Sequence, residues 1–187
     1  SKATEGIGSP LSQARQLLHR LGLRPKKGLG QHFLTDTQVL RLITQTAELS
    51  PGDIVLEVGP GLGILTQELA SHASQVLAVE IDKPLAAALS QKLAGFPHVQ
   101  VISDDILTLD IAQLLPSRTG LPPEAVAFQY KVVANLPYYI ASAVLRHFLA
   151  ASLKPKLMVI MVQREVAQAM VARPGHMSLL SVSVQFY

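Results

Sequence analysis

Short apolar runs alternate along this chain with segments of helical periodicity, and this alternation constrains the fold more than any other feature. The runs have the length and continuity of strands covered on both faces, and they occupy residues 54–58, 76–79, 99–102, 131–134 and 157–162. Apolar residues at helical spacing predict helices after a cap at Thr35 or Asp36, from near Leu62, over 83–94, and near 140–149 and 164–171. The pattern predicts an α/β fold whose mostly parallel sheet has helices on both faces, with residues 115–128 as a long connection.

A glycine-rich turn follows the first apolar run. Gly59, Gly61 and Gly63 allow the backbone to turn tightly and to approach a ligand closely. The helix expected from Leu62 would point its N-terminus at the same ligand. The spacing is one residue tighter than the G-x-G-x-x-G fingerprint of dinucleotide-binding proteins, which disfavours a nicotinamide-dependent oxidoreductase. Taken alone, the turn also fits a purely structural role.

Acidic residues stand where the next two predicted strands end. Glu80 comes 21 residues after Gly59, where an acidic side chain can accept the ribose hydroxyls of a nucleoside. Asp105 follows the third strand and could accept from an adenine amino group. A single acid in such a place is often a helix cap, which is the role that we predict for Asp82. Because ligands of parallel sheets bind at the carboxyl ends of the strands, Glu80 and Asp105 together favour a nucleoside site.

Asn135-Leu136-Pro137-Tyr138 follow the fourth apolar run and bring a second kind of chemistry. The exocyclic amine of adenine is a poor nucleophile because its lone pair is delocalised into the ring. The Asn135 side-chain oxygen and the Leu136 carbonyl could accept its two N–H groups and direct the lone pair at an electrophile. Pro137 would stiffen this loop, and Tyr138 could stack on a flipped base. An Asn-containing turn with a core tyrosine is the structural alternative.

The composition excludes several classes of protein. With 187 residues, 49% of them apolar, the chain suits one domain with a sizeable core. Its apolar runs are far shorter than the roughly 20 residues of a membrane-spanning helix, so we expect no membrane segment. The absence of Cys excludes disulfides and thiolate chemistry and agrees with a cytoplasmic location. The six His residues lack metal-ligand spacing, so we expect no metal site.

Basic residues gather in two stretches of the sequence. Five Lys or Arg residues and no acid lie between Gly6 and Thr35, and a second stretch from Arg146 to Arg173 contains only one acid, Glu165. Two such stretches would suit a nucleic-acid backbone. On charge alone, however, a solvated surface is the commoner explanation.

Together these motifs resemble the S-adenosylmethionine-dependent rRNA adenine N6,N6-dimethyltransferases of the small ribosomal subunit. The resemblance runs from about residue 20 to the end of the chain and depends on residues 27–34, 56–63, 79–82, 105, 135–138 and 163–167. It implies a Rossmann-like class I methyltransferase fold and S-adenosyl-L-methionine as the cofactor. It also implies that the chain, as a cytoplasmic monomer, methylates the N6 amines of two adjacent adenosines near the 3′ end of small-subunit rRNA, within a partly assembled subunit, and so serves ribosome biogenesis.

The resemblance assigns a role to each matched position. Tyr138 would stack the substrate adenine, and Asn135 would meet both the cofactor and the target amine, with Leu136 and Pro137 beside it. The remaining positions would bind the cofactor: Gln31, His32 and Leu34 on its entry side, Glu57, Gly59 and Gly61 around its methionine part, Glu80 at the ribose, Asp105 at the adenine, and Ile81 and Ile106 next to these two acids.

The resemblance also predicts how the chain is divided. Residues 1–34 would form a basic arm, with a short helix over 11–21, that covers the cofactor, and residues 35–187 would form a catalytic domain. The family's last strands and its C-terminal helical domain are expected to be missing, so weak cofactor binding and inefficient methylation are predicted for this chain. Residues 178–187 alternate like a strand, although the resemblance implies a helix there.

At three places that concern RNA contacts, this chain differs from the residues that the family usually has. Two other functions also stay open. Tyr139 stands where the family usually has Asn, Ala169 where it usually has Arg, and a common Tyr-Gly pair is missing before Leu180. One alternative function is methylation of large-subunit rRNA in antibiotic resistance. The other is a non-catalytic RNA-binding role in ribosome assembly.

Overall fold

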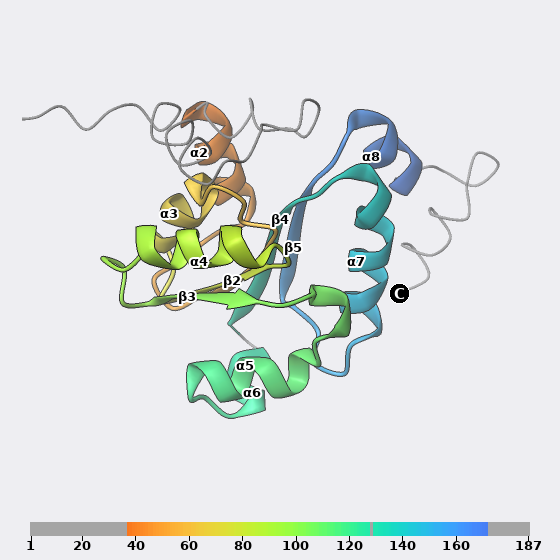
Figure 1. Cartoon of the computed structure of the whole chain (residues 1–187). Helices are drawn as coiled ribbons and strands as arrows, with labels where there is room; N and C mark the ends of the chain where they lie inside the picture. The colour runs from red at the N-terminus through yellow and green to blue at the C-terminus, as the bar shows by residue number, and fades with distance from the viewer. Residues whose placement is uncertain (1–36, 128, 172–187) are drawn as a thin grey trace, which may run out of the picture.

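The computed structural model describes residues 37–127 and 129–171, in which strands and helices alternate along the chain (Figure 1). The strands are β1 (Ile54–Val58), β2 (Gln75–Glu80), β3 (Val99–Ser103), β4 (Tyr130–Asn135) and β5 (Leu157–Met161). The helices are α2 (Thr37–Thr46), α3 (Ile64–Ala70), α4 (Lys83–Lys92), the 3-10 helix η2 (Ile106–Thr108), α5 (Ile111–Thr119), α6 (Pro123–Ala127), α7 (Tyr138–Ala150) and α8 (Arg164–Met170).

The five strands form one sheet in the order β3-β2-β1-β4-β5, and every neighbouring pair is parallel. This arrangement confirms the predicted α/β class. The chain moves outward from β1 to β3 and then returns to the other side of β1 with β4. The switch in strand order therefore lies between β1 and β4, where α/β sheets bind ligands at their carboxyl ends.

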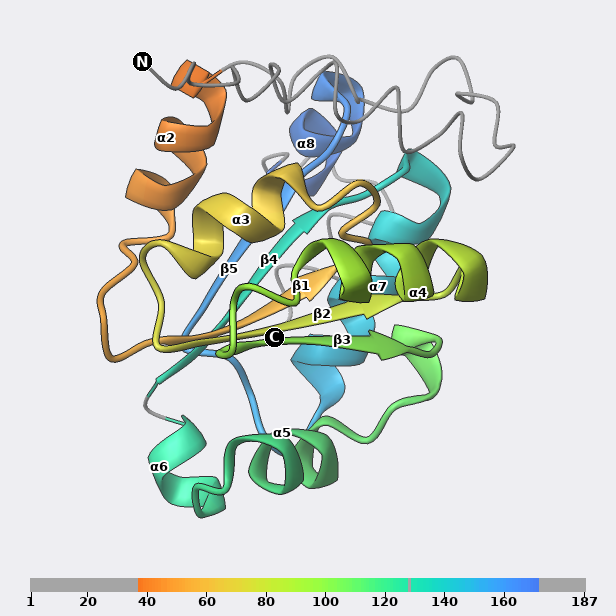
Figure 2. The same ribbon diagram turned by 60° about the vertical axis from the view of Figure 1, so that its left-hand side comes forward.

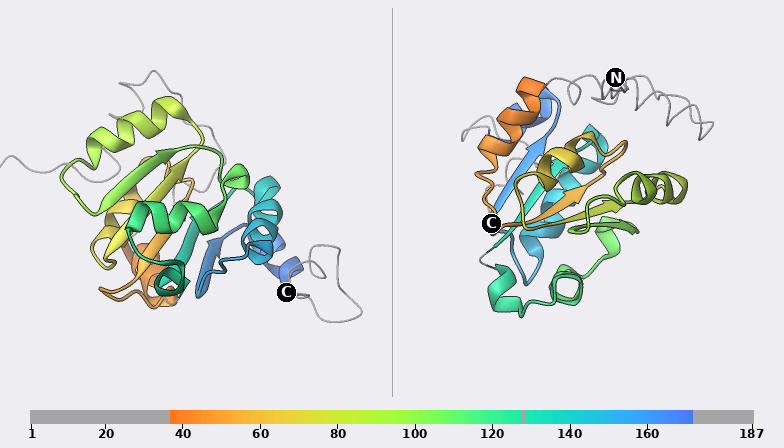
Figure 3. Two further views of the ribbon diagram at one scale, coloured as in Figure 1. Left: turned by 90° about the horizontal axis from the view of Figure 1, so that it is seen from below. Right: turned by 90° about the vertical axis from the view of Figure 1, so that its left-hand side faces the viewer.

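Helices cover both faces of the sheet. In Figure 2 the helices α2, α3 and α4 lie on one side and α5 and α6 on the other, and the right-hand view of Figure 3 shows the same division. Successive side chains of a strand point to opposite faces, so Leu56 and Val58 join the cluster that contains Phe148 of α7, whereas Val55 joins the cluster under α2 and α3.

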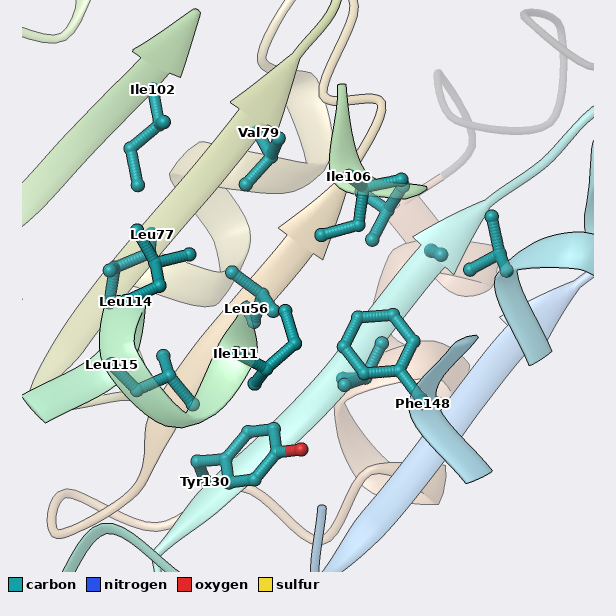
Figure 4. Close-up of a cluster of buried hydrophobic side chains, with 14 of the residues drawn as sticks. Leu56, Leu77, Val79, Ile102, Ile106, Ile111, Leu114, Leu115, Tyr130 and Phe148 are labelled. Carbon is teal, nitrogen blue, oxygen red and sulfur yellow. The ribbon is translucent and has the colours of Figure 1, made fainter. Parts of the chain in front are cut away.

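The larger cluster fills the space between the sheet and helices α5 and α7 (Figure 4). Leu56, Leu77 and Leu115 are fully buried in it, and so is Tyr130, whose hydroxyl donates to the Leu153 carbonyl over 2.8 Å. Burying a side chain of this size stabilises the fold by about 1.5–3 kcal/mol. This layer fixes β1, β2 and β4 against one another and thereby sets the positions of their carboxyl ends.

A buried ion pair ties the sheet together at its amino end. Lys131 Nζ lies 2.9 Å from Asp53 Oδ2 and also donates to the carbonyls of Ala47 and Glu48, over 3.0 and 2.7 Å. Burial alone would raise the pKa of Asp53, but hydrogen bonds from Lys131 and Ser50 outweigh it and hold the pKa below its ordinary value. The pair connects the end of α2 with the starts of β1 and β4.

The predicted long connection over 115–128 is wrong. Residues 111–119 form α5, which Asp110 caps by accepting from the Ala112 N–H over 2.9 Å, and α6 follows. Pro116 lies inside α5, where proline normally destabilises a helix by about 3 kcal/mol. Burial of Ile111 and Leu115 against the sheet outweighs this preference.

Other element boundaries agree with the prediction to within a few residues. Helix α3 begins at Ile64 rather than near Leu62, because Gly61 and Gly63 have left-handed φ angles of 56° and 73° that no right-handed helix contains. The predicted arm, its helix over 11–21 and the conformation of residues 178–187 lie outside the described residues. Among the helices that the structure describes, none has both the length and the apolar character needed to cross a membrane.

Candidate functional site

Strand register brings three of the predicted site residues to one edge of the sheet. Val58 of β1 pairs with Val79 of β2 on one side and with Ala134 of β4 on the other. Gly59, Glu80 and Asn135, each one residue further along, therefore lie side by side at the switch in strand order. The sheet thus places the glycine turn directly beside the Asn135 motif.

The glycine turn is held open by backbone conformations that favour glycine. Gly59, Gly61 and Gly63 have φ angles of 69°, 56° and 73°, in the left-handed region that L-residues other than Asn and Asp rarely adopt. A Cβ atom at Gly59 or Gly61 would meet no atom within 4 Å, whereas one at Gly63 would lie 2.3 Å from Leu89 Cδ1. The first two glycines border open space, and the third packs against α4.

Glu80 holds the turn from the neighbouring strand. The residue is only 6% exposed, and each of its carboxylate oxygens accepts one backbone N–H: Oε1 from Asp82 over 3.0 Å and Oε2 from Gly61 over 3.2 Å. These two bonds fix the plane of the carboxylate. A carboxylate has about four acceptor positions, so Glu80 can accept further hydrogen bonds from a ligand.

Asp105 and Asp82 both cap short helices. Asp82 caps α4 by accepting from the Leu85 N–H over 2.9 Å, as predicted. Asp105 caps η2, with Oδ1 accepting from the Leu107 N–H over 3.0 Å. Asp105 follows β3, whose last residue pairs with Glu80, so it stands near the same edge. Its role toward a ligand stays a prediction.

Glu57 is the most unusual group of the site. It lies on β1 two residues after Val55 and so faces α3, and it is 1% exposed. Burial raises its pKa to about 8, with a smaller increase from the charge of Glu80, whereas the nearby Thr66 hydroxyl acts to lower it. No hydrogen bond of normal geometry joins the two side chains, since Glu57 Oε2 and Thr66 Oγ1 are both buried without a partner. Buried polar groups nearly always have partners, so this pair is suited to meet a polar ligand or a water molecule.

The Asn135 motif forms the junction between β4 and α7. Asn135 ends the strand, the Leu136 N–H donates to the Met161 carbonyl over 3.1 Å, and Pro137, with a φ of −58°, immediately precedes the first residue of α7. The Leu136 side chain is buried in the core, which leaves its carbonyl in a fixed loop. Tyr138 is the first residue of α7, and its predicted stacking role stays a prediction, whereas the Tyr139 side chain is 70% exposed.

The remaining predictions concern the entry side of the cofactor site and a metal site. Gln31, His32 and Leu34 lie outside the described residues. Within residues 37–127 and 129–171, no group of three or more His, Cys, Asp or Glu side chains could hold a metal ion.

Sequence reasoning missed two residues near the turn. Lys92, the last residue of α4, is partly buried and donates from Nζ to the Leu62 carbonyl over 2.7 Å. Thr66 faces Glu57 from α3. Nothing in a linear pattern identifies Lys92, because its partner is 30 residues away. The sequence contains one indication of the Glu57 and Thr66 pair: Glu57 is a single acid in the otherwise continuous apolar run 54–58.

Comparison with known families agrees with this geometry. A family model described as ribosomal RNA adenine dimethylase matches residues 22–187. The chain belongs to this family. Ribosomal RNA small subunit methyltransferase A of Dehalococcoides mccartyi is 50% identical to it over 185 residues, which are 99% of this chain and 60% of the relative. The protein of the same name from Moorella thermoacetica is 47% identical over 173 residues, 91% of this chain and 60% of the relative.

Two solved structures are similar in fold to this chain. The 23S rRNA methyltransferase ErmE is 36% identical, with a TM-score of 0.63 over 79% of this chain and 54% of ErmE. A dimethyladenosine transferase from Plasmodium falciparum is 25% identical, with a TM-score of 0.65 over 81% of this chain and 51% of that protein. The predicted class I methyltransferase fold is therefore confirmed. This family member spans about three fifths of the length of the curated relatives that it matches.

Proposed function

We propose that this chain carries the catalytic site of an S-adenosylmethionine-dependent enzyme that dimethylates the N6 amines of two adjacent adenosines near the 3′ end of small-subunit rRNA. One observation carries the proposal: the sheet register places Asn135 beside Gly59 and in the same row as Glu80. A motif suited to hold a base amine thereby adjoins a turn suited to hold a nucleoside cofactor. The names of the relatives at 47–50% identity favour the small subunit over the large-subunit reaction named for ErmE.

The cofactor would lie across the carboxyl ends of β1, β2 and β3. Glu80 would accept the ribose hydroxyls at the positions that its two backbone bonds leave free. Ile81, which is 65% exposed, would offer an apolar face to the adenine ring, with Asp105 and Ile106 beyond it. Bound there, the cofactor supplies an electrophilic methyl group on a sulfonium.

The methionine part would pass the glycine turn. Gly59 and Gly61 border open space, which allows a ligand to approach their backbone closely. Glu57 and Thr66, with their unpartnered buried oxygens, would receive the ammonium end directly or through a water molecule. Gln31, His32 and Leu34 would cover the entry side.

Asn135 and Leu136 would hold the target amine. Asn135 Oδ1 and the Leu136 carbonyl would each accept one N–H and turn the lone pair toward the methyl group. Asn135 and Leu136 would thereby present the nitrogen to the methyl group that the cofactor would supply, and the N–H proton that this group replaces would pass to solvent. Pro137 would keep the loop rigid, and Tyr138 would stack on the extruded adenine. Catalysis of this kind rests on positioning and needs no strong general base.

The wider setting belongs to the same proposal. Residues 1–34 would be a basic arm that covers the cofactor, and residues 35–187 the catalytic domain, acting as a monomer on a pre-subunit particle in the cytoplasm. Arg164, exposed at the start of α8, and Arg146, exposed on α7, would support contact with the rRNA backbone.

A labelling experiment tests the proposal. The chain is given methyl-labelled S-adenosylmethionine with unmethylated small-subunit particles, large-subunit particles or DNA, and the full-length Dehalococcoides mccartyi relative serves as the reference enzyme. We expect slow labelling of adenosines in small-subunit RNA alone, and its loss in Asn135→Ala but not in Gln113→Ala, a change on α5. Label confined to large-subunit RNA would overturn the substrate, and full activity of Asn135→Ala would overturn the mechanism.

The predicted weakness of the chain is tested in the same assay. Dimethylation at the rate of the reference enzyme would show that the site needs nothing beyond residues 1–187.

A further inference from the structure

Helix α4 contacts the glycine turn at two places on one of its faces. Lys92 Nζ donates to the Leu62 carbonyl over 2.7 Å, and a Cβ atom on Gly63 would lie 2.3 Å from Leu89 Cδ1. Leu89 and Lys92 are three residues apart, so they project from the same side of the helix. The turn therefore packs against α4 at Gly63 and is hydrogen-bonded to it at Leu62.

The turn needs such support because of its composition. Three glycines in five residues give the free backbone many conformations, and fixing them before or during binding has an entropic cost of about 1–2 kcal/mol per residue. Gly61 is already held from the sheet side by Glu80 Oε2. Leu62, the next residue, is held by Lys92 of α4. The two side chains thus hold the peptide units on either side of the Gly61–Leu62 peptide bond.

Lys92 is suited to this task by its surroundings. It is partly buried, and burial lowers the pKa of its ammonium group. Among residues 37–127 and 129–171, no carboxylate forms an ion pair with it. Its hydrogen bond to the turn is therefore the interaction that orients the end of this side chain.

We propose that Lys92 is a positioning residue of the cofactor site, which holds the Leu62 carbonyl against α4 and so presets the glycine turn for the amino-acid part of S-adenosylmethionine. Lys92 acts through the turn and does not touch the cofactor itself. The inference rests on the proposed function, since it assumes that the turn receives this part of the cofactor. Lys92 would thus affect the affinity for the cofactor without contacting it.

The inference predicts a loss that depends on the ligand. A hydrogen bond from a charged group contributes about 1.5–3 kcal/mol, so Lys92→Met should weaken binding of S-adenosylhomocysteine by about tenfold or more. Binding of 5′-methylthioadenosine, which has the same adenosine but no amino-acid part, should change by less than about twofold. Lys92→Arg, which keeps a charged donor, should restore most of the affinity for S-adenosylhomocysteine.

Isothermal titration calorimetry of the 187-residue chain with both ligands tests this expectation. Lys156→Met is the matched control, because it removes the same charge from an exposed position just before β5, at the far end of the sheet. The midpoint of thermal unfolding is measured for every variant. If Lys92→Met does not fold, Lys92→Gln, which is shorter but still polar, replaces it.

Each outcome has a distinct meaning. A selective loss for S-adenosylhomocysteine with rescue by Arg supports the positioning role. Unchanged affinity, or equal losses for both ligands as in general destabilisation, overturns the inference and leaves the proposed function intact. Failure of the parent chain to bind either ligand overturns the proposed cofactor and the inference together.

Discussion

The two ends of the central strands treat buried polar groups in opposite ways. At the amino end, Asp53 and Lys131 are both buried, and their charged atoms have protein partners in Ser50, Ala47 and Glu48. At the carboxyl end, Glu57 and Thr66 are equally buried but carry oxygens without a partner. The first arrangement is complete within the protein, whereas the second leaves capacity for a ligand.

This difference indicates that the carboxyl end of the strands is less stable than the amino end and is suited to bind a ligand. A satisfied buried pair connects strands, and an unsatisfied buried group destabilises the fold by about 1–3 kcal/mol. The left-handed glycines lie at the same end as the unsatisfied oxygens. A flexible glycine backbone and buried oxygens without partners both suit a site that binds a ligand. Removing a buried polar side-chain group should therefore destabilise the fold at the amino end and stabilise it at the carboxyl end.

The largest effect is expected from breaking the amino-end pair. Lys131→Met leaves the Asp53 carboxylate buried without its cation, and loss of one partner of a buried pair typically lowers the free energy of unfolding by about 3–5 kcal/mol. Urea denaturation monitored by circular dichroism measures the change. Lys156→Met, at an exposed position, should change stability by less than about 0.5 kcal/mol. A small loss for Lys131→Met would remove the claimed contrast between the ends.

A pH-dependent effect is expected from Glu57. In the folded chain its pKa is about 8, against an ordinary value of 4.5. Between these two values the folded state holds a proton that the unfolded state has released, so stability falls as the pH rises. At about 1.4 kcal/mol per unit, the loss is on the order of 4 kcal/mol across this range.

The variant Glu57→Gln carries no proton to lose and should be less sensitive to pH. Urea midpoints at pH 5, 6.5 and 8 measure this effect, with the exposed Glu124→Gln as control. Parallel pH profiles for Glu57→Gln and the parent chain would show that Glu57 does not keep its proton in the folded state.

An intermediate effect is expected at the third glycine of the turn. Gly63→Ala forces a Cβ into the left-handed region, which costs about 1–2 kcal/mol, and the new atom must also displace Leu89. We expect a loss of about 2 kcal/mol by thermal unfolding. Gly52→Ala, which has open space and no left-handed angle, should be neutral or slightly stabilising. Equal effects of the two changes would contradict the close packing of the turn on α4.

The smallest effect should be a gain in stability. Thr66→Val removes a buried hydroxyl that has no partner and keeps the shape of the side chain, so we expect stabilisation by about 1 kcal/mol. Cofactor affinity, measured by calorimetry, should fall at the same time. Destabilisation by Thr66→Val would mean that the hydroxyl is satisfied in solution, and the two ends would then be alike.

Much of the fold could be predicted from the sequence because continuous apolar runs indicate which segments are buried strands. The run at 54–58 coincides with β1 because a central parallel strand is covered on both faces. The error over 115–128 came from the prolines of this segment, among them Pro116, because proline normally breaks a helix. The helix that contains Pro116 exists because tertiary burial of Leu115 outweighs local preference, and this burial cannot be inferred from neighbouring residues.

The candidate site was predictable only in part, for the same physical reason. Gly59, Glu80 and Asn135 each stand at the end of an apolar run, so a parallel sheet must bring them to one edge. The contacts of Lys92 with Leu62 and of Lys131 with Asp53 join residues 30 and 78 positions apart. Such pairs depend on how helices and strands pack in three dimensions, which periodicity does not specify.

The position of β1 in the sheet has a consequence for synthesis on the ribosome. Its partner β4 begins about 70 residues after β1 ends, and at 5–20 residues per second this interval lasts roughly 4–14 s. During that time β1 can pair with β2, but its other edge stays open. The seam between β1 and β4 is where Asn135 meets Gly59, so the nascent chain completes its site only when this last central strand is added.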